Sequence, residues 1–230
     1  MTELLIRGAT VYPGEAPPFT GDVAVDGGVI TLVTRCHELG SPPEVAAEVV
    51  DAAGLILCPG FIDLHAHSAL APFADPLLTP KLGQGFTTDV INPDGLAPAP
   101  VAPERRAERQ AYLRPLEGNG PAEWPWSTVE EYLDALDATQ PALSLVPSVG
   151  HGAVRDLVLG GGRLTPTTEH VREMRRQVKL GFEAGARMLS FGLVYLPGAY
   201  AATPELEALA KEAARAGAPL VPHVRNEGHG

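Results

Sequence analysis

After Pro59, short apolar segments alternate with helix-forming segments, and this alternation limits the possible folds more than any other feature of the sequence. Five apolar segments are typical of buried β-strands, namely 61–67, 86–91, 143–149, 186–191 and 219–224. Helices are predicted between them, near 75–83, over 103–113, from a capping box at Ser127 and Glu130, over 167–184, and from an N-cap at Thr203 to Gly217. Repeated strand–helix units with strands of this kind predict a parallel sheet covered by helices.

Two architectures contain such a sheet. A doubly wound sheet usually has a glycine-rich phosphate-binding turn after its first strand, and no such turn follows residues 61–67. Polar residues instead cluster at the carboxyl ends of the strands, as they do in a (β/α)8 barrel. A complete barrel needs eight strands and about 250 residues. We therefore expect an α/β fold in which residues 58–230 form about five of eight strands of a barrel, truncated after strand five, in a fragment of a longer protein.

Residues 1–57 have a different pattern. Short segments rich in β-branched residues are separated by turn signals, among them Asp26-Gly27-Gly28, which favours a hairpin. We expect a small all-β unit here, with little chemistry of its own.

Composition excludes several classes of protein. The formal net charge is −11 and no Lys/Arg-rich run offsets it, which argues against a nucleic-acid partner. No apolar run has the length of a membrane span, and the amino terminus does not have the pattern of a signal peptide. Two cysteines, Cys36 and Cys58, do not make a disulfide framework, so we expect a cytoplasmic protein.

The strand over 61–67 ends in two histidines, His65 and His67. Side chains alternate across a strand, so both imidazoles project to the same face and make half of a metal site. A surface pair on an edge strand is the alternative. Asp63 shares this face, where it either orients a ligand histidine or closes the strand end through backbone hydrogen bonds.

Two later strands end in further ligand types. Asp94 comes just after the strand over 86–91, where it is either an ordinary turn residue or a carboxylate ligand. His223 ends the fifth strand at the position that the histidine pair has in the first. It is either a third ligand or a hydrogen-bonded core histidine.

Other polar residues at strand ends are candidates for substrate binding. His151 follows the third strand between two glycines, and it either contacts substrate or fills a turn. Tyr195 and Tyr200 follow the fourth strand, where they either line a pocket or pack under their loop. Arg225 shares the inward face of the fifth strand and either binds a substrate carboxylate or pairs with Glu227.

Together these residues resemble the amidohydrolase superfamily, and specifically its D-aminoacylase (N-acyl-D-amino-acid deacylase) branch. The segment 59–67, Pro-Gly-Phe-Ile-Asp-Leu-His-Ala-His, is typical of the superfamily. The motifs that point to the branch follow in order at 85–88, 150–152, 192–195, 197–200 and 223–228.

The resemblance implies a metal-dependent barrel beside a small β-sandwich built from both chain ends, of which residues 1–57 are the amino-terminal part. It implies one or two divalent ions, zinc, and a small-molecule substrate, an N-acyl-D-amino acid, whose amide bond is hydrolysed. His65 and His67 match the ligand pair of strand one, and His223 matches the histidine of strand five. Asp94 stands where well-studied deacylases have a cysteine ligand, a harder donor replacing a softer one.

The resemblance also places Tyr195 near the substrate, and it leaves the general base unassigned. The family takes a further histidine ligand from strand six and its catalytic aspartate from strand eight, both expected beyond Gly230. A cyclic-amide amidohydrolase, such as a dihydroorotase or hydantoinase, is the alternative enzyme, but the strand over 186–191 lacks the lysine usual in those enzymes. A non-catalytic truncated fragment is the other alternative, and its open barrel edge would favour self-association.

Overall fold

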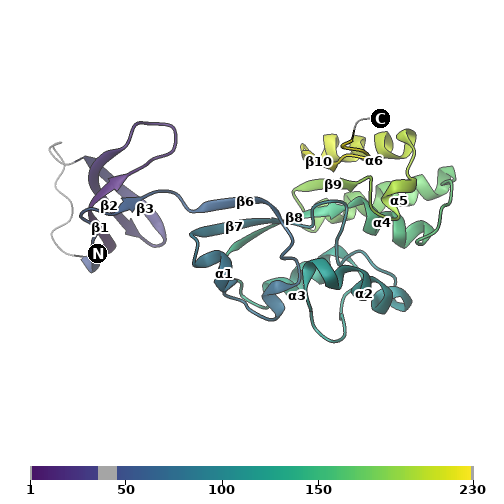
Figure 1. Ribbon diagram of the computed structural model, residues 1–230, viewed down its shortest axis with the longest axis horizontal. Helices are drawn as coiled ribbons and strands as arrows, with labels where there is room; N and C mark the ends of the chain where they lie inside the picture. The colour runs from purple at the N-terminus through teal and green to yellow at the C-terminus, as the bar shows by residue number, and fades with distance from the viewer. Residues whose placement is uncertain (1, 36–45, 229–230) are drawn as a thin grey trace. The chain divides into compact units, whose positions relative to one another are not determined.

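The computed structural model describes residues 2–35 and 46–228, so Cys36 lies outside the described residues. The chain forms two compact units, Met1–Gly60 and Phe61–Gly230 (Figure 1). Within the described ranges, no helix is both long enough and apolar enough to cross a membrane.

The first unit is a five-stranded mixed sheet. Its strands are β1 (Thr2–Val11), β2 (Phe19–Asp26), β3 (Val29–Arg35), β4 (Ala46–Asp51) and β5 (Ile56–Leu57). The order is β3-β2-β1-β4, and β5 also pairs with β1. Strands β1, β2 and β3 are antiparallel neighbours, whereas β4 and β5 run parallel to β1. Asp26 pairs with Val29 across Gly27 and Gly28, both at positive φ, which confirms the predicted hairpin.

The second unit contains five parallel strands. They are β6 (Phe61–Ala66), β7 (Phe86–Ile91), β8 (Ser144–Gly150), β9 (Met188–Gly192) and β10 (Leu220–His223). Each strand pairs with the next one along the chain, so the order β6 to β10 never reverses (Figure 1). A doubly wound sheet reverses its order at one point, whereas barrel strands add in one direction. The order therefore confirms the predicted partial (β/α)8 barrel.

Helices follow the strands along the chain. They are α1 (Thr79–Leu82), α2 (Arg106–Glu117), α3 (Val129–Asp137), α4 (His151–Leu159), α5 (Thr168–Glu183) and α6 (Thr203–Arg215), with 3-10 turns η1 (Ala71–Phe73), η2 (Pro103–Arg105) and η3 (Gly198–Tyr200). Met174 and Val178 on α5 are fully buried and share a core with Val149 of β8 and Leu189 of β9. Burial of each such side chain stabilises the fold by about 1.5–3 kcal/mol.

Some helix boundaries differ from the prediction. The helix expected near 75–83 is a single turn, because Leu78 just before it has φ 47, a left-handed conformation that a helix cannot continue through. The capping box begins at Thr128 and closes with Glu131, one residue later than predicted. Thr203 is the first residue of α6 and makes no side-chain cap.

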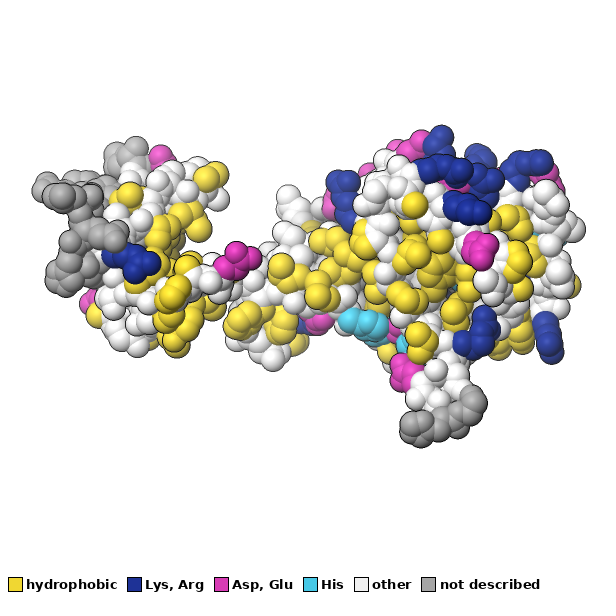
Figure 2. All heavy atoms as spheres, turned by 90° about the horizontal axis from the view of Figure 1, so that it is seen from above, with side chains coloured by type: hydrophobic (Ala, Val, Ile, Leu, Met, Phe, Trp, Pro, Cys, Tyr) yellow, Lys and Arg dark blue, Asp and Glu magenta, His cyan; other side chains and the backbone are white. Residues whose placement is uncertain are grey.

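Strand β6 lies at one edge of the sheet and exposes large apolar side chains, those of Phe61, Ile62 and Leu64. Figure 2 shows a broad group of exposed apolar side chains on the second unit. A sheet edge of this kind offers both backbone pairing and apolar contact. Self-association through it stays a prediction.

Candidate metal centre

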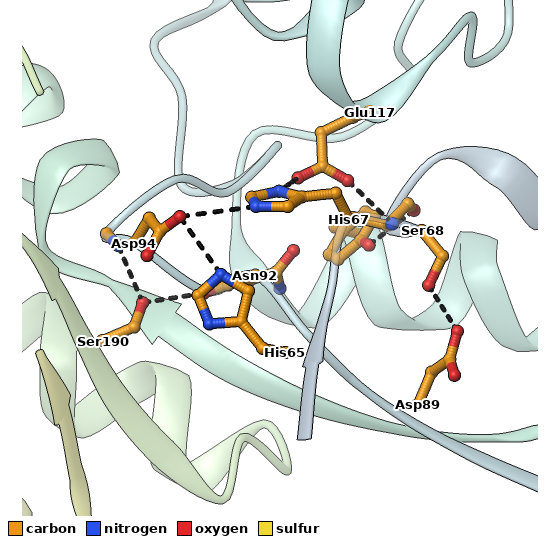
Figure 3. Close-up of polar contacts among 11 residues, drawn as sticks. His65, His67, Ser68, Asp89, Asn92, Asp94, Glu117 and Ser190 are labelled. Carbon is orange, nitrogen blue, oxygen red and sulfur yellow. Dashed lines mark hydrogen bonds and ion pairs between the residues drawn. The ribbon is translucent and has the colours of Figure 1, made fainter. Parts of the chain in front are cut away.

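His65, His67 and Asp94 converge at the carboxyl ends of β6 and β7 (Figure 3). Oδ2 of Asp94 lies 3.3 Å from Nε2 of His65 and 3.4 Å from Nε2 of His67. Among the described residues, these three make up the group of potential ligands whose donor atoms all lie within 4.8 Å of one another. The predicted pairing of the two histidines on one face is confirmed, with their ring centroids 5.4 Å apart.

The arrangement of these donors fits a divalent cation. Asp94 is buried, and its Oδ1 has no hydrogen-bond partner within residues 2–35 and 46–228. A tetrahedral zinc ion with ligands at about 2.0–2.1 Å holds neighbouring ligand atoms about 3.3–3.4 Å apart. The two nitrogen–oxygen distances have that value, and two imidazoles with one carboxylate are a donor set that zinc accepts.

The turn that carries Asp94 has an unusual backbone. Asn92 and Asp94 both adopt left-handed φ values, 61° and 58°. Each such residue costs of order 1 kcal/mol, so the surrounding structure must hold the turn in place. The Ser190 hydroxyl donates to the Asn92 carbonyl at 2.7 Å and accepts from the Gly95 amide at 3.1 Å. The side-chain amide of Asn92 donates to the Ser148 carbonyl at 3.2 Å.

Glycines at the ends of β8 and β9 and in the first turn of α4 let the backbone of this turn come close. A Cβ on Gly192 would lie 1.7 Å from the Asp94 carbonyl oxygen. A Cβ on Gly150 or Gly152 would lie 2.8 Å from the Gly95 carbonyl oxygen. Because backbone atoms fill those positions, any side chain there would push the turn and its carboxylate out of place.

Glu117, the last residue of α2, was not predicted as a site residue from the sequence. Its side chain is buried, with Oε1 2.9 Å from Nδ1 of His67 and Oε2 accepting from the Ala69 amide at 3.0 Å (Figure 3). The hydrogen bond to Glu117 is the main reason why the pKa of His67 is raised. A carboxylate at the carboxyl end of a helix opposes the helix dipole, and that signal in the sequence could have drawn attention to it.

Asp63 has the second of its two predicted roles. Its Oδ1 accepts from the backbone amide of His65 at 3.0 Å, and its Oδ2 pairs with Lys81. The Lys81 hydrogen bond holds the pKa of Asp63 below its ordinary value. Lys81 also lies 3.3 Å from Oδ1 of the buried Asp89, whose Oδ2 accepts from the Ser68 hydroxyl at 2.8 Å. This network holds the backbone before and after the two histidines, through Asp63 on one side and Ser68 on the other.

Comparison with known proteins identifies the family. Residues 48–226 match the amidohydrolase family known as Amidohydro_3. The chain belongs to the amidohydrolase family. This confirms the resemblance drawn from the motifs.

Several relatives of this amidohydrolase are deacylases. The chain is 34% identical over 229 residues to the N-acyl-D-aspartate deacylase of Alcaligenes xylosoxydans xylosoxydans, covering 98% of this chain and 44% of that protein. The structure of N-acyl-D-glutamate deacylase from Bordetella bronchiseptica, with zinc and a phosphonate inhibitor, matches at a TM-score of 0.86 and 35% identity over 98% of this chain and 46% of that one. A D-aminoacylase structure matches at a TM-score of 0.88 and 30% identity, and the match covers 100% of this chain and 46% of that one. The chain thus spans less than half the length of these relatives.

His223 and Tyr195 lie together in this amidohydrolase chain, at the ends of β10 and β9. Their rings meet edge to face with centroids 5.1 Å apart, and Nδ1 of His223 lies 3.0 Å from the Val224 carbonyl oxygen. His223 is not a member of the three-residue group around Asp94. The reason is topological, because β6 and β10 are the two outer strands of the described sheet. Its predicted role as a metal ligand stays a prediction.

Arg225 is bound to the loop that follows β9. Its guanidinium donates to the carbonyl oxygens of Ala199 and Ala201, the latter at 2.8 Å. The guanidinium has five N–H donors, so these two bonds leave donors for a substrate carboxylate. Its predicted substrate contact stays a prediction.

His151 begins α4 directly after β8, so it does not fill a turn, which was one of its two predicted roles. The side chain is fully buried, and Nε2 lies 2.8 Å from Oε1 of Glu205 on α6. Arg155 donates to the same oxygen at 3.1 Å. These buried contacts account for the position of the ring, and the predicted substrate contact stays a prediction.

Proposed function

We propose that this chain forms the metal-binding part of an enzyme that hydrolyses the amide bond of N-acyl-D-amino acids. The observation that carries the proposal is the convergence of His65, His67 and Asp94 at the spacing of zinc ligands. This group of three residues lies at the carboxyl ends of barrel strands, where enzymes of this fold have their active sites. Deacylases at 30–35% identity over nearly the whole chain support the substrate class.

The residues of the chain have distinct roles in this proposal. Nε2 of His65, Nε2 of His67 and the Asp94 carboxylate hold the ion. Zinc, when bound, supplies a Lewis acid that polarises the amide carbonyl and lowers the pKa of water. Tyr195 and Arg225 follow the ends of β9 and β10, at the same edge of the sheet, and we assign them to the substrate. We predict that the general base is a residue beyond Gly230.

The unit assignment is part of the same proposal. We propose that residues 1–57 belong to a small β-sandwich and residues 58–230 to the metal-dependent barrel. We also retain a cytoplasmic location, supported by the presence of only two cysteines. The cyclic-amide alternative is not favoured, because β9 (Met188–Gly192) contains no lysine.

The test compares this chain with a version extended through the sequence that follows it in its gene. Both are loaded with zinc and assayed on N-acetyl-D-amino acids, with the L-isomers and a hydantoin as controls. We expect the extended protein to hydrolyse the D-isomers and to lose activity on chelation. Absence of hydrolysis by the zinc-loaded extended protein would refute the deacylase proposal, and activity of the 230-residue chain alone would refute the prediction of a distant base.

A further inference from the structure

We propose that Glu117 is a positioning residue that holds His67 in the one neutral tautomer able to bind the metal. The inference rests on the proposed metal site, and it adds a residue outside the motifs. Glu117 contacts no other member of the three-residue group, so it acts only through the His67 ring.

The hydrogen bonds of Glu117 define the proton on the ring. Its Oε2 faces the Ala69 amide, which can only donate, so this oxygen must accept. Its Oε1 lies 2.9 Å from Nδ1 of His67, and a carboxylate without a proton can only accept there too. The neutral ring therefore carries its proton on Nδ1. The lone pair is left on Nε2, which faces Asp94 at 3.4 Å.

The surroundings of Glu117 keep it in this position. Its carboxylate is nearly inaccessible to solvent and lies at the carboxyl end of α2. The backbone of Ala69 is held at two points, since its amide donates to Glu117 and its carbonyl accepts from the Tyr132 hydroxyl at 2.8 Å. Tyr132 in turn packs against Trp126, with ring centroids 5.3 Å apart. The carboxylate therefore has little freedom to turn away from His67.

Burial at this end of a helix is unfavourable for a carboxylate. It opposes the helix dipole and removes the charge from water, and both effects destabilise the local structure. The hydrogen bonds with His67 and the Ala69 amide offset these costs and keep the carboxylate against the ring.

An amide cannot replace this carboxylate. Glutamine has one acceptor oxygen, whereas Glu117 faces two donors, Nδ1–H of His67 and the Ala69 amide. If the glutamine oxygen accepts from Ala69, its NH2 group points at Nδ1 and drives the ring proton to Nε2. If it accepts from Nδ1, its NH2 group faces a backbone N–H. Glu117→Gln therefore either disfavours the tautomer of His67 with its proton on Nδ1 or removes the hydrogen bond from the Ala69 amide.

The test measures zinc affinity of the full chain by competition with a chromophoric chelator. We expect Glu117→Gln to weaken zinc binding about 10- to 100-fold, the range found when an outer partner of a ligand histidine is lost. Glu131→Gln is the matched control, because it removes the same charge from an exposed carboxylate that also accepts from backbone amides. We expect the control to bind zinc as the unaltered chain does. Equal affinity of Glu117→Gln and the unaltered chain would overturn the inference.

A second measurement does not depend on a variant that folds. Long-range proton–nitrogen NMR of the metal-free, unaltered chain in mildly alkaline buffer reports which nitrogen of neutral His67 carries the proton. We expect Nδ1, and a proton on Nε2 would overturn the inference. If the unaltered chain binds no zinc, the proposed function fails, whereas the NMR result still decides whether Glu117 sets the tautomer.

Discussion

The molecule contains two pairs of histidine and glutamate that look alike at first. His67 pairs with Glu117 at 2.9 Å, and His151 pairs with Glu205 at 2.8 Å. Both histidines follow a barrel strand directly, and both glutamates are buried on helices. The two pairs differ in the ring nitrogen that contacts the glutamate, which is Nδ1 in the first pair and Nε2 in the second.

The remaining nitrogen of each ring has a different environment. In His67, whose side chain is 22% exposed, Nε2 faces the Asp94 carboxylate. In His151, which is fully buried, Nδ1 has no partner in the described ranges and is enclosed near Gly198. The charges differ too. Arg155 neutralises Glu205, whereas the two carboxylates around His67 have no arginine or lysine contact among the residues that the structure describes. A cation is therefore favoured at the first pair and superfluous at the second.

The comparison shows that a histidine–glutamate pair alone does not mark a binding site. The direction of the free ring nitrogen and the charge left uncompensated around it separate a candidate centre from a structural link.

The largest effect is expected at the structural pair. Glu205→Ala leaves the buried Arg155 guanidinium without its carboxylate, which costs about 3–5 kcal/mol of unfolding free energy. Urea unfolding followed by tryptophan fluorescence reports it, because both tryptophans, Trp124 and Trp126, lie in the second unit. Zinc affinity of the folded protein should stay unchanged. A tenfold loss of zinc affinity in Glu205→Ala would show that the His151–Glu205 pair contributes to metal binding, and it would contradict the proposed difference between the two pairs.

The next effect is expected at the metal centre. Asp94→Asn keeps the shape of the side chain and tolerates the left-handed backbone, but it removes the charge of a ligand. We expect zinc affinity to fall by at least about 100-fold, more than the loss of an outer partner causes. Metal-free stability should be kept or raised, because a buried carboxylate oxygen without a partner is replaced. Asp75→Asn is the control, because that carboxylate accepts from Leu77 and Thr79 and is not part of the metal-ligand group. Unchanged zinc binding by Asp94→Asn would exclude Asp94 as a ligand.

A third test concerns the backbone that supports Asp94. Gly192→Ala places a Cβ on the Asp94 carbonyl oxygen, so we expect a loss of about 1–3 kcal/mol in stability together with weaker zinc binding. Gly162→Ala is the matched control, since a Cβ there meets open space. Thermal unfolding and chelator competition measure both effects. Similar behaviour of the two variants would mean that the glycine contacts do not set the turn.

The smallest effect is expected at the ion pairs of Glu212, between α5 and α6. Burial raises the pKa of Glu212, but hydrogen bonds from Arg175 and Arg215, both at 2.6 Å, outweigh it and hold that pKa below its ordinary value. A carboxyl group with a lowered pKa stabilises the fold above its unfolded pKa, and this contribution is lost as pH falls through the folded pKa.

Glu212→Gln should therefore cost at most about 1 kcal/mol at neutral pH, because water screens the exposed arginines. The difference from the unaltered chain should shrink in acid, as measured by urea unfolding over a pH series. A difference that grows as pH falls would contradict the assigned sign. Zinc affinity serves as the internal control and should not change.

Much of the fold could be predicted because the patterns that specify it are local. The period-two alternation of 61–67 predicted that His65 and His67 share a face, and turn residues predicted the hairpin at Gly27-Gly28. The start of α4 at His151 was missed, because flanking glycines favour a turn as much as a helix start. Asp94 remained ambiguous, since a turn aspartate and a ligand aspartate have the same local sequence.

The sequence by itself determined the strand–helix alternation, the barrel type and the histidine pair, since each depends on residues within a few positions of one another. Only the tertiary structure decided which side chains complete the centre. Glu117 reaches His67 across 50 positions, and Ser190 supports the turn of Asn92 across 98. Contacts between such distant positions depend on how the strands and helices pack, and no local pattern encodes that packing.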